Sequence, residues 1–495
     1  MRMVNCSFKV NVWASLFFSK INVYFFAEMM HMMSFKNIAC LFILGFVTCC
    51  SKKQDSSMPV ISSNPDTTTS AKTDVAFWLT NADQSVLFKK QNGSLLFSVS
   101  SNSNPTIYVD STQTYQTMDG FGFALTGGSA QVINLMSASE ANVLLQELFA
   151  TDSNNIGISY LRVSIGASDL SSSVFTYDDV PPGQTDTALA YFSIAPENDD
   201  LIPVLRKILQ INPAIKILAS PWTAPVWMKT NNNSVGGNFN HQYDDVYAKY
   251  FVKYIQAMQS NGINIDAITV QNEPMNAGNN PSMLLSASEE ADFIKNHLGP
   301  AFKNAGINTK IFIFDHNCDN PGYPLSILAD TAVLPYIDGS AFHLYAGDIS
   351  AMSQVHDAAP SKNVYFTEQW VGAPSNFSAD FNWAVKNLIV GASRNWSKIV
   401  LQWNLANDIN YEPHTVGGCT NCLGAVTIGS AVTRNTAYYT IAHAAKFVRP
   451  GSVRISTNVP GNLQNVAFVT PDGKKVLIVL NNSNTSQSFN ISFNG

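Results

Sequence analysis

Residues 215–274 contain two short apolar runs separated by a longer amphipathic segment. The first run is IKILA (215–219), the amphipathic segment is YDDVYAKYFVKYIQAMQ (243–259), and the second run is AITV (267–270). Short apolar runs are typical of strands buried on both faces, and a longer segment with apolar residues every three or four positions is typical of a helix. A strand, a helix and a second strand in this order predict two parallel strands joined by a helical crossover.

The same alternation continues on both sides of this unit and gives eight strand-like runs. They are Gly120–Leu125, Tyr160–Ile165, Ile215–Ala219, Ala267–Val270, Ile311–Phe314, Ser340–Phe342, Val364–Phe366 and Ile399–Leu401. The segments predicted to be helical lie between them and are Ser139–Phe149, Leu201–Ile211, Tyr243–Gln259, Ala287–Phe302, Leu325–Val333 and Phe381–Ala392. Eight such units predict the α/β class and a (β/α)8 TIM barrel, whereas a doubly wound open sheet is the alternative.

Alternating strand patterns flank the barrel region. Residues 75–111 precede it and residues 447–495 follow it, and both carry short runs such as TIYVD and VLIVL between Gly and Asn turns. We expect these two segments to pair in one β-sandwich side domain attached to a catalytic barrel of residues 112–446.

The composition narrows the class of protein. The chain has 495 residues, of which 46% are hydrophobic and 13% are charged, and its net charge is -6. This hydrophobic content excludes a disordered chain, and without a basic excess nucleic-acid binding is not expected. A surface built from uncharged polar residues suits a neutral polar ligand.

The N-terminal region predicts export. Lys36 is followed by the apolar run IACLFILGFVT (38–48) and then by Cys49 and Cys50. A basic flank before an apolar run this short predicts a signal peptide. A cysteine directly after the run resembles a bacterial lipoprotein site, so we expect acylation of Cys50 and an outer-membrane or cell-surface protein that contacts the membrane only through its lipid. The alternatives are acylation of Cys49, a short anchor, or an ordinary cleaved signal with a periplasmic or secreted product.

The segments around this signal have no predicted fold. Met32 and Met33 lie just before the basic flank, so we expect translation to start there and residues 1–31 to be untranslated. Residues 1–50 are then the signal and lipoprotein segment. Residues 51–74 are rich in Ser, Thr, Asp, Asn and Pro, which predicts a disordered linker.

Two cysteines lie close together in the folded region. Cys419 and Cys422 stand in the Gly-rich segment GGCTNCLG, which is compatible with a small disulfide loop or with half of a zinc site. Zinc would require a second pair of ligands at suitable spacing, and export permits a disulfide, so we favour the disulfide. No close group of His, Asp or Glu residues predicts a metal site.

Two glutamates follow predicted strands on separated parts of the barrel. Glu273 follows the fourth run in the segment QNEP, and Glu368 follows the seventh run in TEQW. Catalytic residues of a TIM barrel lie at the C-terminal ends of its strands, and two opposed carboxylates are the requirement for hydrolysis of a glycosidic bond. One carboxyl group must stay protonated and the other must be ionised. The alternative is that one glutamate is a surface residue and the other a partner in a barrel salt bridge.

Other residues at the strand ends suit a sugar. Trp222, Trp370 and Trp403 offer faces on which sugar rings stack, and Asn272 can hold the 2-hydroxyl group. His316, in FDHN, either contacts the ligand or satisfies hydrogen bonds of the barrel.

Several motifs in collinear order resemble glycoside hydrolase family 30. They are QTMDGFGFALT (116–126), LRVSIGASDLS (161–171), LASPWTAPVWMKTN (218–231), TVQNEP (269–274), FDHN (314–317), FHLYAGD (342–348), FTEQW (366–370) and YYTIAHAAKFVRPGSVRI (438–455). The resemblance implies a retaining mechanism without a cofactor, with Glu273 as acid/base and Glu368 as nucleophile. It also implies a subsite for the non-reducing sugar lined by Arg162, Asp169, Trp222, Asn272, His343, Tyr345 and Trp403. Arg162 is expected to orient the nucleophile.

The family contains several activities. We expect cleavage of β-glucosidic bonds, with β-1,6-glucan favoured because the loop at residues 406–422 lacks the pattern of the glucosylceramidases. Glucosylceramidase-like hydrolysis of β-glucosides (sphingolipid metabolism), β-xylosidase and β-fucosidase action remain alternatives, and endo or exo action stays open. The non-enzyme alternative is a carbohydrate-binding surface lipoprotein. We expect a monomer.

Overall fold

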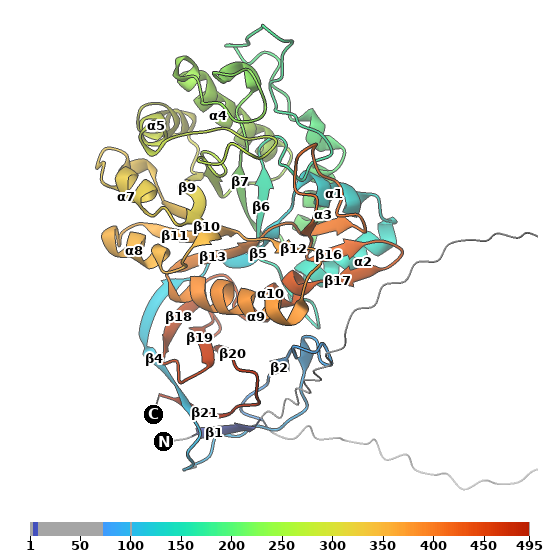
Figure 1. Ribbon diagram of the computed structural model, residues 1–495, viewed down its shortest axis with the longest axis vertical. Helices are drawn as coiled ribbons and strands as arrows, with labels where there is room; N and C mark the ends of the chain where they lie inside the picture. Colours follow the sequence, from blue (N-terminus) through green and yellow to red (C-terminus); the bar gives the residue numbers. More distant parts are fainter. Residues whose placement is uncertain (1–2, 8–72, 100, 495) are drawn as a thin grey trace, which may run out of the picture. The chain divides into compact units, whose positions relative to one another are not determined.

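A closed barrel of eight parallel strands forms the centre of the chain. The computed structural model describes residues 3–99 except 8–72, and residues 101–494. The barrel strands are β5 (Gly120–Ala124), β6 (Tyr160–Ser164), β7 (Lys216–Ser220), β8 (Ala267–Thr269), β9 (Lys310–Cys318), β10 (Gly339–Gly347), β11 (Asn363–Glu368) and β13 (Ser397–Gln402) (Figure 1). Neighbouring strands pair in parallel, and β13 closes the ring on β5. The predicted TIM barrel is therefore confirmed, and the alternative of a doubly wound open sheet is wrong.

The interior of the barrel is packed with side chains. Seven of the eight strands, all but β5, contribute buried residues to one layer inside the barrel. In this layer the Phe312 and Tyr365 rings stack with their centroids 3.7 Å apart. A larger apolar cluster lies between the strands and the surrounding helices. Because both faces of each strand are buried, the strands are continuous apolar runs in the sequence.

Helices connect the barrel strands and cover them. They are α1 (Gly127–Asn134), α2 (Ala138–Phe149), α3 (Leu201–Ile211), α4 (Asp244–Ser260), α5 (Ala287–Phe293), α6 (Gly299–Ala305), α7 (Gly322–Leu328), α8 (Ala351–Ala358), α9 (Phe377–Ala384) and α10 (Thr436–Ala445). Wider helical turns, η4 (Ile294–Leu298) and η6 (Val385–Ala392), join α5 to α6 and extend α9. Short 3₁₀ turns are η1 (Ala195–Asn198), η2 (Val226–Met228), η3 (His241–Tyr243) and η5 (Leu334–Tyr336).

One predicted helix is shifted. The segment predicted at Leu325–Val333 begins earlier, at Gly322, and α7 ends at Leu328. The Asp330 carboxylate accepts a hydrogen bond from the backbone N–H of Ala332 at 2.9 Å. This side-chain contact favours a turn in place of a further helical turn.

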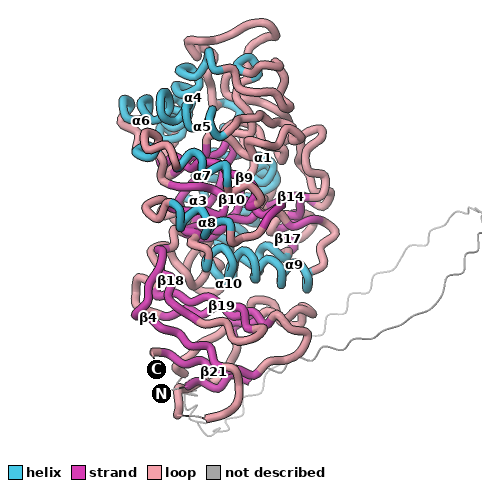
Figure 2. Tube along the Cα trace, turned by 60° about the vertical axis from the view of Figure 1, so that its left-hand side comes forward, coloured by secondary structure: helices cyan, strands magenta, loops and turns pink. Residues whose placement is uncertain are grey.

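A second sheet combines segments from both sides of the barrel in the sequence. Its strands are β1 (Met3–Ser7), β4 (Thr106–Thr117), β18 (Val453–Thr457), β19 (Leu463–Val469), β20 (Lys475–Asn481) and β21 (Ser488–Phe493), in the order β1-β21-β4-β18-β19-β20. Four of them, β4, β18, β19 and β21, are labelled in Figure 2. Arg394, which follows η6, donates hydrogen bonds to the Thr457 hydroxyl and to the carbonyl of Asn465. The barrel and the sheet are therefore joined by polar contacts of a half-buried arginine.

The segment before β4 is less regular than its sequence pattern suggests. Its described residues contain the short pair β2 (Trp78–Leu79) and β3 (Lys89–Lys90) and an isolated bridge between Val75 and Leu95. Residues 95–99 of the run LLFSVS belong to none of the named strands, and the backbone N–H of Phe97 donates to the Asp74 side chain at 2.9 Å. Val75, Leu95 and Phe97 nevertheless pack against the core of the second sheet.

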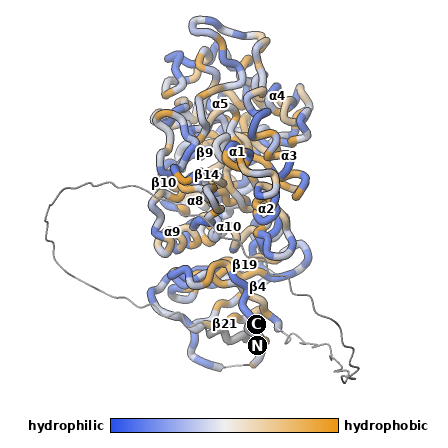
Figure 3. Tube along the Cα trace, turned by 90° about the vertical axis from the view of Figure 1, so that its right-hand side faces the viewer, coloured by the Kyte–Doolittle hydropathy of each residue, from blue (hydrophilic) through white to orange (hydrophobic). Residues whose placement is uncertain are grey.

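Hydrophobic residues are concentrated along the strands, whereas the outer loops are largely hydrophilic (Figure 3). No helix among residues 3–7, 73–99 and 101–494 is long and apolar enough to cross a membrane. The structure does not describe residues 8–72, which include Cys50, most of the signal segment and nearly all of the linker at residues 51–74. The predictions for these segments stay predictions.

Candidate active site

The two candidate catalytic glutamates lie at the C-terminal end of the barrel. Glu273 follows β8, Glu368 is the last residue of β11, and both are buried. His343 of β10 lies between them, with its Nδ1 atom 3.2 Å from Glu273 Oε1 and 3.8 Å from Glu368 Oε1. These two oxygens are therefore at most about 7 Å apart. Retaining glycosidases hold their carboxyl groups about 5–5.5 Å apart, and inverting ones about 6.5–9.5 Å. The upper bound is thus compatible with retention and excludes most of the inverting range.

Glu368 is bound by a buried cation and by a hydroxyl group. A guanidinium nitrogen of Arg162 contacts Glu368 Oε2, and the Tyr345 hydroxyl donates to Oε1 at 2.8 Å. Arg162 lies on β6 and is completely buried, so its charge acts on Glu368 without screening by solvent. Its other terminal nitrogen donates to Asn272 Oδ1 at 2.7 Å. An ionised, oriented carboxylate is what a nucleophile at the anomeric carbon requires.

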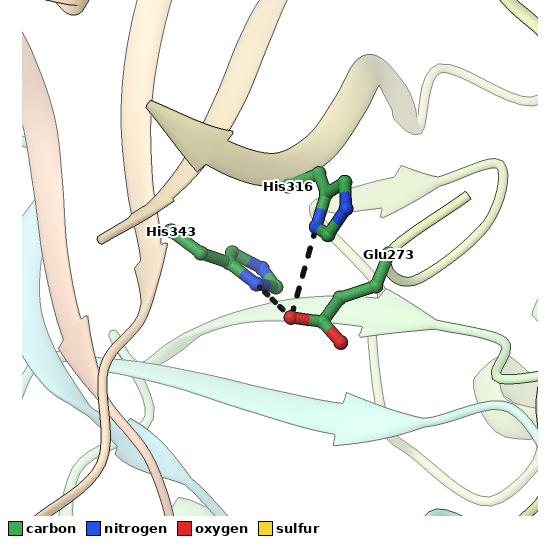
Figure 4. Close-up of side chains that lie close together, drawn as sticks. All are labelled: Glu273, His316 and His343. Atoms are coloured by element: carbon green, nitrogen blue, oxygen red, sulfur yellow. Dashed lines mark hydrogen bonds and ion pairs between the residues drawn. The ribbon is translucent and has the colours of Figure 1, made fainter. Parts of the chain in front are cut away.

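Glu273 accepts contacts at both carboxylate oxygens. Its Oε1 atom faces His343 and lies 3.7 Å from His316 Nδ1, and its Oε2 accepts from the Asn276 amide at 2.7 Å (Figure 4). Burial raises the pKa of Glu273, but the His316 and His343 imidazoles outweigh burial and hold this pKa below its ordinary value. Without substrate, Glu273 is therefore ionised.

His343 carries the proton that Glu273 lacks. Its Nε2 atom lies 3.0 Å from Asp315 Oδ1, so both ring nitrogens face carboxylates and both are N–H donors. Burial lowers the pKa of His343, but the charge of Glu368 and the bonds to Asp315 and Glu273 raise it to about 9. From the sequence, one of the two glutamates is expected to hold this proton, whereas the geometry gives one proton to the Glu273–His343 pair.

Aromatic rings form a wall beside the carboxylates. The Trp222 and Trp403 ring centroids are 5.4 Å apart, and the Arg162 guanidinium carbon lies 4.9 Å and 5.9 Å from them. Trp370 and Cys419 pack against the same cluster. Because Asn272 Oδ1 is occupied by Arg162, its amide N–H groups remain for a sugar hydroxyl.

Asp169 links the site to the cysteine loop. Burial, followed by the charges of Glu368 and Glu273, raises the pKa of Asp169 to about 7. The Asp169 carbonyl accepts from the backbone N–H of Thr415 at 2.8 Å.

A disulfide joins Cys419 and Cys422, and β15 (Cys422–Leu423) pairs with β12 (Val371–Gly372), directly after Trp370. The loop at residues 406–422, which also contains β14 (Ala406–Asp408), is thereby fixed against the substrate side of the barrel. The remaining strands of this region are β16 (Val426–Ile428) and β17 (Val432–Arg434).

Comparison with known proteins assigns the chain to a family. Residues 118–448 match the glycosyl hydrolase family 30 TIM-barrel domain, and residues 451–495 match the family 30 beta sandwich domain. The chain belongs to glycoside hydrolase family 30. It is therefore a glycosidase, and the resemblance seen in the sequence motifs is confirmed.

The similar proteins include β-1,6-glucanases and glucosylceramidases. The chain is 37% identical over 403 residues to the endo-1,6-beta-D-glucanase of Neurospora crassa, covering 77% of this chain and 82% of that protein. It is 32% identical over 407 residues to putative glucosylceramidase 2 of Caenorhabditis elegans, covering 78% of each. Among solved structures, the endo-beta1,6-glucanase BT3312 matches with a TM-score of 0.78 and 35% identity, covering 85% of this chain and 95% of that chain.

Asp315 also belongs to this site, although its sequence motif predicted no role for it. Asp315 is completely buried and accepts hydrogen bonds from Arg162 at 2.7 Å, Thr269 at 2.8 Å and Thr367 at 2.7 Å, in addition to its contact with His343. Burial raises the pKa of Asp315, but the charge of Arg162 and the bond from His343 hold it well below its ordinary value. Asp315 thus contacts both Arg162, which binds Glu368, and His343, which faces Glu273.

Backbone conformations at this site are unusual for residues other than glycine. Glu273, Phe314 and Asp315 have φ values of 45°, 77° and 51°. Such conformations cost free energy and concentrate at functional sites. The Glu273 N–H donates to the Asp315 carbonyl at 3.0 Å, so the strained segments support each other.

Three of these side chains are also close enough to hold a metal ion. Ligand atoms of Glu273, His316 and His343 lie within 4.8 Å of one another. No spacing motif connects these positions in the sequence, so only the folded barrel brings them together.

Proposed function

We propose that this family 30 enzyme is a retaining endo-β-1,6-glucanase. The observation that carries the hydrolytic mechanism is the placement of Glu273 and Glu368 around His343, with Arg162 in contact with Glu368 and not with Glu273. The linkage is supported by the relatives, because identity to the β-1,6-glucanases is 35–37%, against 29–32% to the glucosylceramidases.

In the first step, Glu368 attacks the anomeric carbon and forms a glycosyl ester. Arg162 and Tyr345 orient the carboxylate, and the bond from the anomeric carbon to the glycosidic oxygen breaks. The departing oxygen takes the proton of the Glu273–His343 pair through Glu273, which faces the opposite side of the site. A shared proton allows Glu273 to be ionised before substrate arrives and still to act as the acid.

In the second step, water attacks the anomeric carbon of the ester. Glu273 accepts a proton from this water, the bond to Glu368 breaks, and the proton returns to the pair with His343. Each turnover therefore restores the starting charges, and two inversions at the anomeric carbon give retention.

The sugar that undergoes attack is held by the aromatic wall and by polar groups. The Trp222 and Trp403 faces bound the ring, Asn272 donates to the 2-hydroxyl group, and Asp169 accepts from a hydroxyl farther from the reacting carbon. Because Asp169 is buried near two other carboxylates, a sugar hydroxyl is a better partner for it than a second anion.

The test is a panel of β-1,6-glucan, β-1,3-glucan and glucosylceramide, with product sizes followed by chromatography and the anomer of the first product read by NMR. We expect mixed oligosaccharides from β-1,6-glucan at early times, released with the β configuration. Glucose as the only early product would replace endo by exo action. Faster cleavage of glucosylceramide than of β-1,6-glucan would reject the proposed substrate, and Glu368→Gln supplies the inactive control.

We also propose that the enzyme is an exported lipoprotein acylated on Cys50. Support comes from the sequence, in which an apolar run behind Lys36 ends at a cysteine pair. In cell fractionation, the wild type should partition with membranes, and Cys50→Ser should release it. Retention of the Cys50→Ser variant, combined with release of Cys49→Ser, would move the modification to Cys49.

A further inference from the structure

Three side chains from adjacent barrel strands converge in the arrangement of a zinc site (Figure 4). Glu273 follows β8, His316 lies on β9 and His343 lies on β10. The Glu273 Oε1 atom is 3.2 Å from His343 Nδ1 and 3.7 Å from His316 Nδ1. Zinc bonds to N and O ligands are about 2.0–2.1 Å long, so a tetrahedral ion places two of its ligand atoms about 3.3 Å apart. These two separations are close to this value, and all three ligand atoms lie within 4.8 Å of one another.

We propose that Glu273, His316 and His343 bind one Zn²⁺ ion in the substrate-free enzyme, and that the bound ion reversibly blocks hydrolysis. Two imidazoles and one carboxylate are a donor set typical of zinc sites with an open fourth position. Nothing in the glycosidase reaction uses the ion, so the site is inhibitory rather than catalytic.

The imidazole of His316 provides an independent indication of a ligand. His316 is 7% exposed, and its Nδ1 atom has no hydrogen-bond partner within the described part of the chain. At 3.7 Å, Glu273 Oε1 is beyond hydrogen-bond distance. Buried polar atoms without a partner are rare, and an ion between His316 and Glu273 would satisfy this one.

The other two ligands are already oriented by outer contacts. His343 Nε2 lies 3.0 Å from Asp315 Oδ1, the carboxylate–histidine arrangement that fixes ligating imidazoles in metalloproteins. Asn276 binds Glu273 Oε2 and leaves Oε1 for the ion. Binding of Zn²⁺ would release the proton between Glu273 and His343 to solvent, with no change of oxidation state.

Loss of this proton explains the inhibition. With Zn²⁺ on Oε1, Glu273 has no proton to give to the departing oxygen, and the ion occupies the approach to that oxygen. Inhibition should therefore be competitive with substrate and should be reversed by a chelator.

A second histidine and carboxylate cluster supplies a matched control. His241 contacts Asp244 through Nδ1 and Glu289 through Nε2, with both distances 3.2 Å. These contacts use opposite sides of an imidazole whose side chain is 41% exposed. His241→Ala therefore removes a histidine with two carboxylate partners at a place where the ligand atoms do not converge.

The experiment is calorimetric titration of chelator-treated enzyme with Zn²⁺, with Co²⁺ absorption as a report on tetrahedral coordination. We expect one tight site per chain, a weakening of about 100-fold or more in His316→Ala, and no change in His241→Ala. If His316→Ala does not fold, Glu273→Gln tests the same site. Unchanged Zn²⁺ affinity in these variants, loss of binding in His241→Ala, or noncompetitive inhibition would overturn the proposal. Because calorimetry needs no substrate, zinc binding at His316 in a protein that cleaves no β-1,6-glucan would reject only the proposed function.

Discussion

Replacement of Asp315 by Asn should shift the alkaline limit of activity towards neutral pH. In the wild type, the Glu273–His343 pair must hold a proton, and the pKa of His343 is raised to about 9. Activity should therefore fall above about pH 9 as this proton is lost. Asp315 faces His343 Nε2 at 3.0 Å, and an opposite charge at such a distance changes a pKa by about 1–3. Asp315→Asn removes this charge, so the pKa of His343 falls and the alkaline limit should move down by about 1–3 pH units.

The assay is kcat/KM for β-1,6-gluco-oligosaccharides from pH 5 to 10, because this parameter reports groups of the free enzyme. A tenfold fall in the proton affinity of His343 corresponds to about 1.4 kcal/mol of lost stabilisation of its protonated form. The same substitution leaves Arg162 with Glu368 as its remaining carboxylate contact, so urea unfolding should show a loss of about 3–5 kcal/mol.

Thr367→Val is the matched control. It removes the 2.7 Å hydrogen bond from the uncharged Thr367 hydroxyl to Asp315 but keeps the Asp315 charge, so its alkaline limit should move by less than about one pH unit. An unchanged alkaline limit in Asp315→Asn, or equal movements in both variants, would refute the assignment of the essential proton to the pair with His343.

Three further predictions concern the nucleophile and acid, the cysteine loop and the pH dependence of stability. Glu368→Gln should lower turnover of β-1,6-glucan by about 10³-fold or more while calorimetry still detects glucan binding, and Glu273→Ala should slow poor leaving groups far more than activated aryl leaving groups. Double replacement of Cys419 and Cys422 by Ala should raise KM several-fold with a smaller change in kcat, because the disulfide loop contacts the substrate wall; a change confined to kcat would contradict this. Burial lowers the pKa of His443 to about 4, so the folded state resists the proton that the unfolded state accepts near pH 6.5, and stability should decrease as pH falls. Urea unfolding should give a contribution from His443 about 2 kcal/mol smaller at pH 5 than at pH 7.5, and His443→Gln should lose this difference.

The barrel could be predicted because local and tertiary requirements coincide in its strands. Strands such as β7 are buried on both faces, so a short apolar run marks each of them, and amphipathic segments mark the helices between. The boundaries were harder to predict. The end of α7 depends on one carboxylate, that of Asp330, and the loss of the predicted strand after Leu95 depends on the Asp74 side chain. Such contacts have no periodicity in the sequence.

The role of Asp315 could not be predicted, because β9 breaks the alternation on which strand analysis depends. Phe312 points into the barrel, and Ile313 and Phe314 both join the cluster outside it. With strict alternation, Phe314 would point inward and Asp315 outward. Positive φ values at both residues, together with a shift in the β9–β10 register, turn Asp315 inward to Arg162 instead. The polar motif FDHN indicated that this strand ends at the site. Which of its side chains reaches the site depends on the backbone conformation, which the sequence pattern does not reveal.

The different chemical roles of two identical side chains follow from the partners that the barrel gives them. Glu368 contacts Arg162, which holds its proton permanently, so Glu368 has a cation beside it but no proton to receive. Glu273 contacts His343, whose pKa of about 9 is far lower than that of an arginine, so Glu273 has a proton source as well as a cation. Asp315 touches both of these bases and keeps each of them charged. An exchange of the two cations would therefore exchange the roles of the glutamates, although the sequence around each glutamate would be unchanged. The division between nucleophile and acid is thus a property of β6 and β10, the strands that carry these two cations, rather than of the motifs that contain the glutamates.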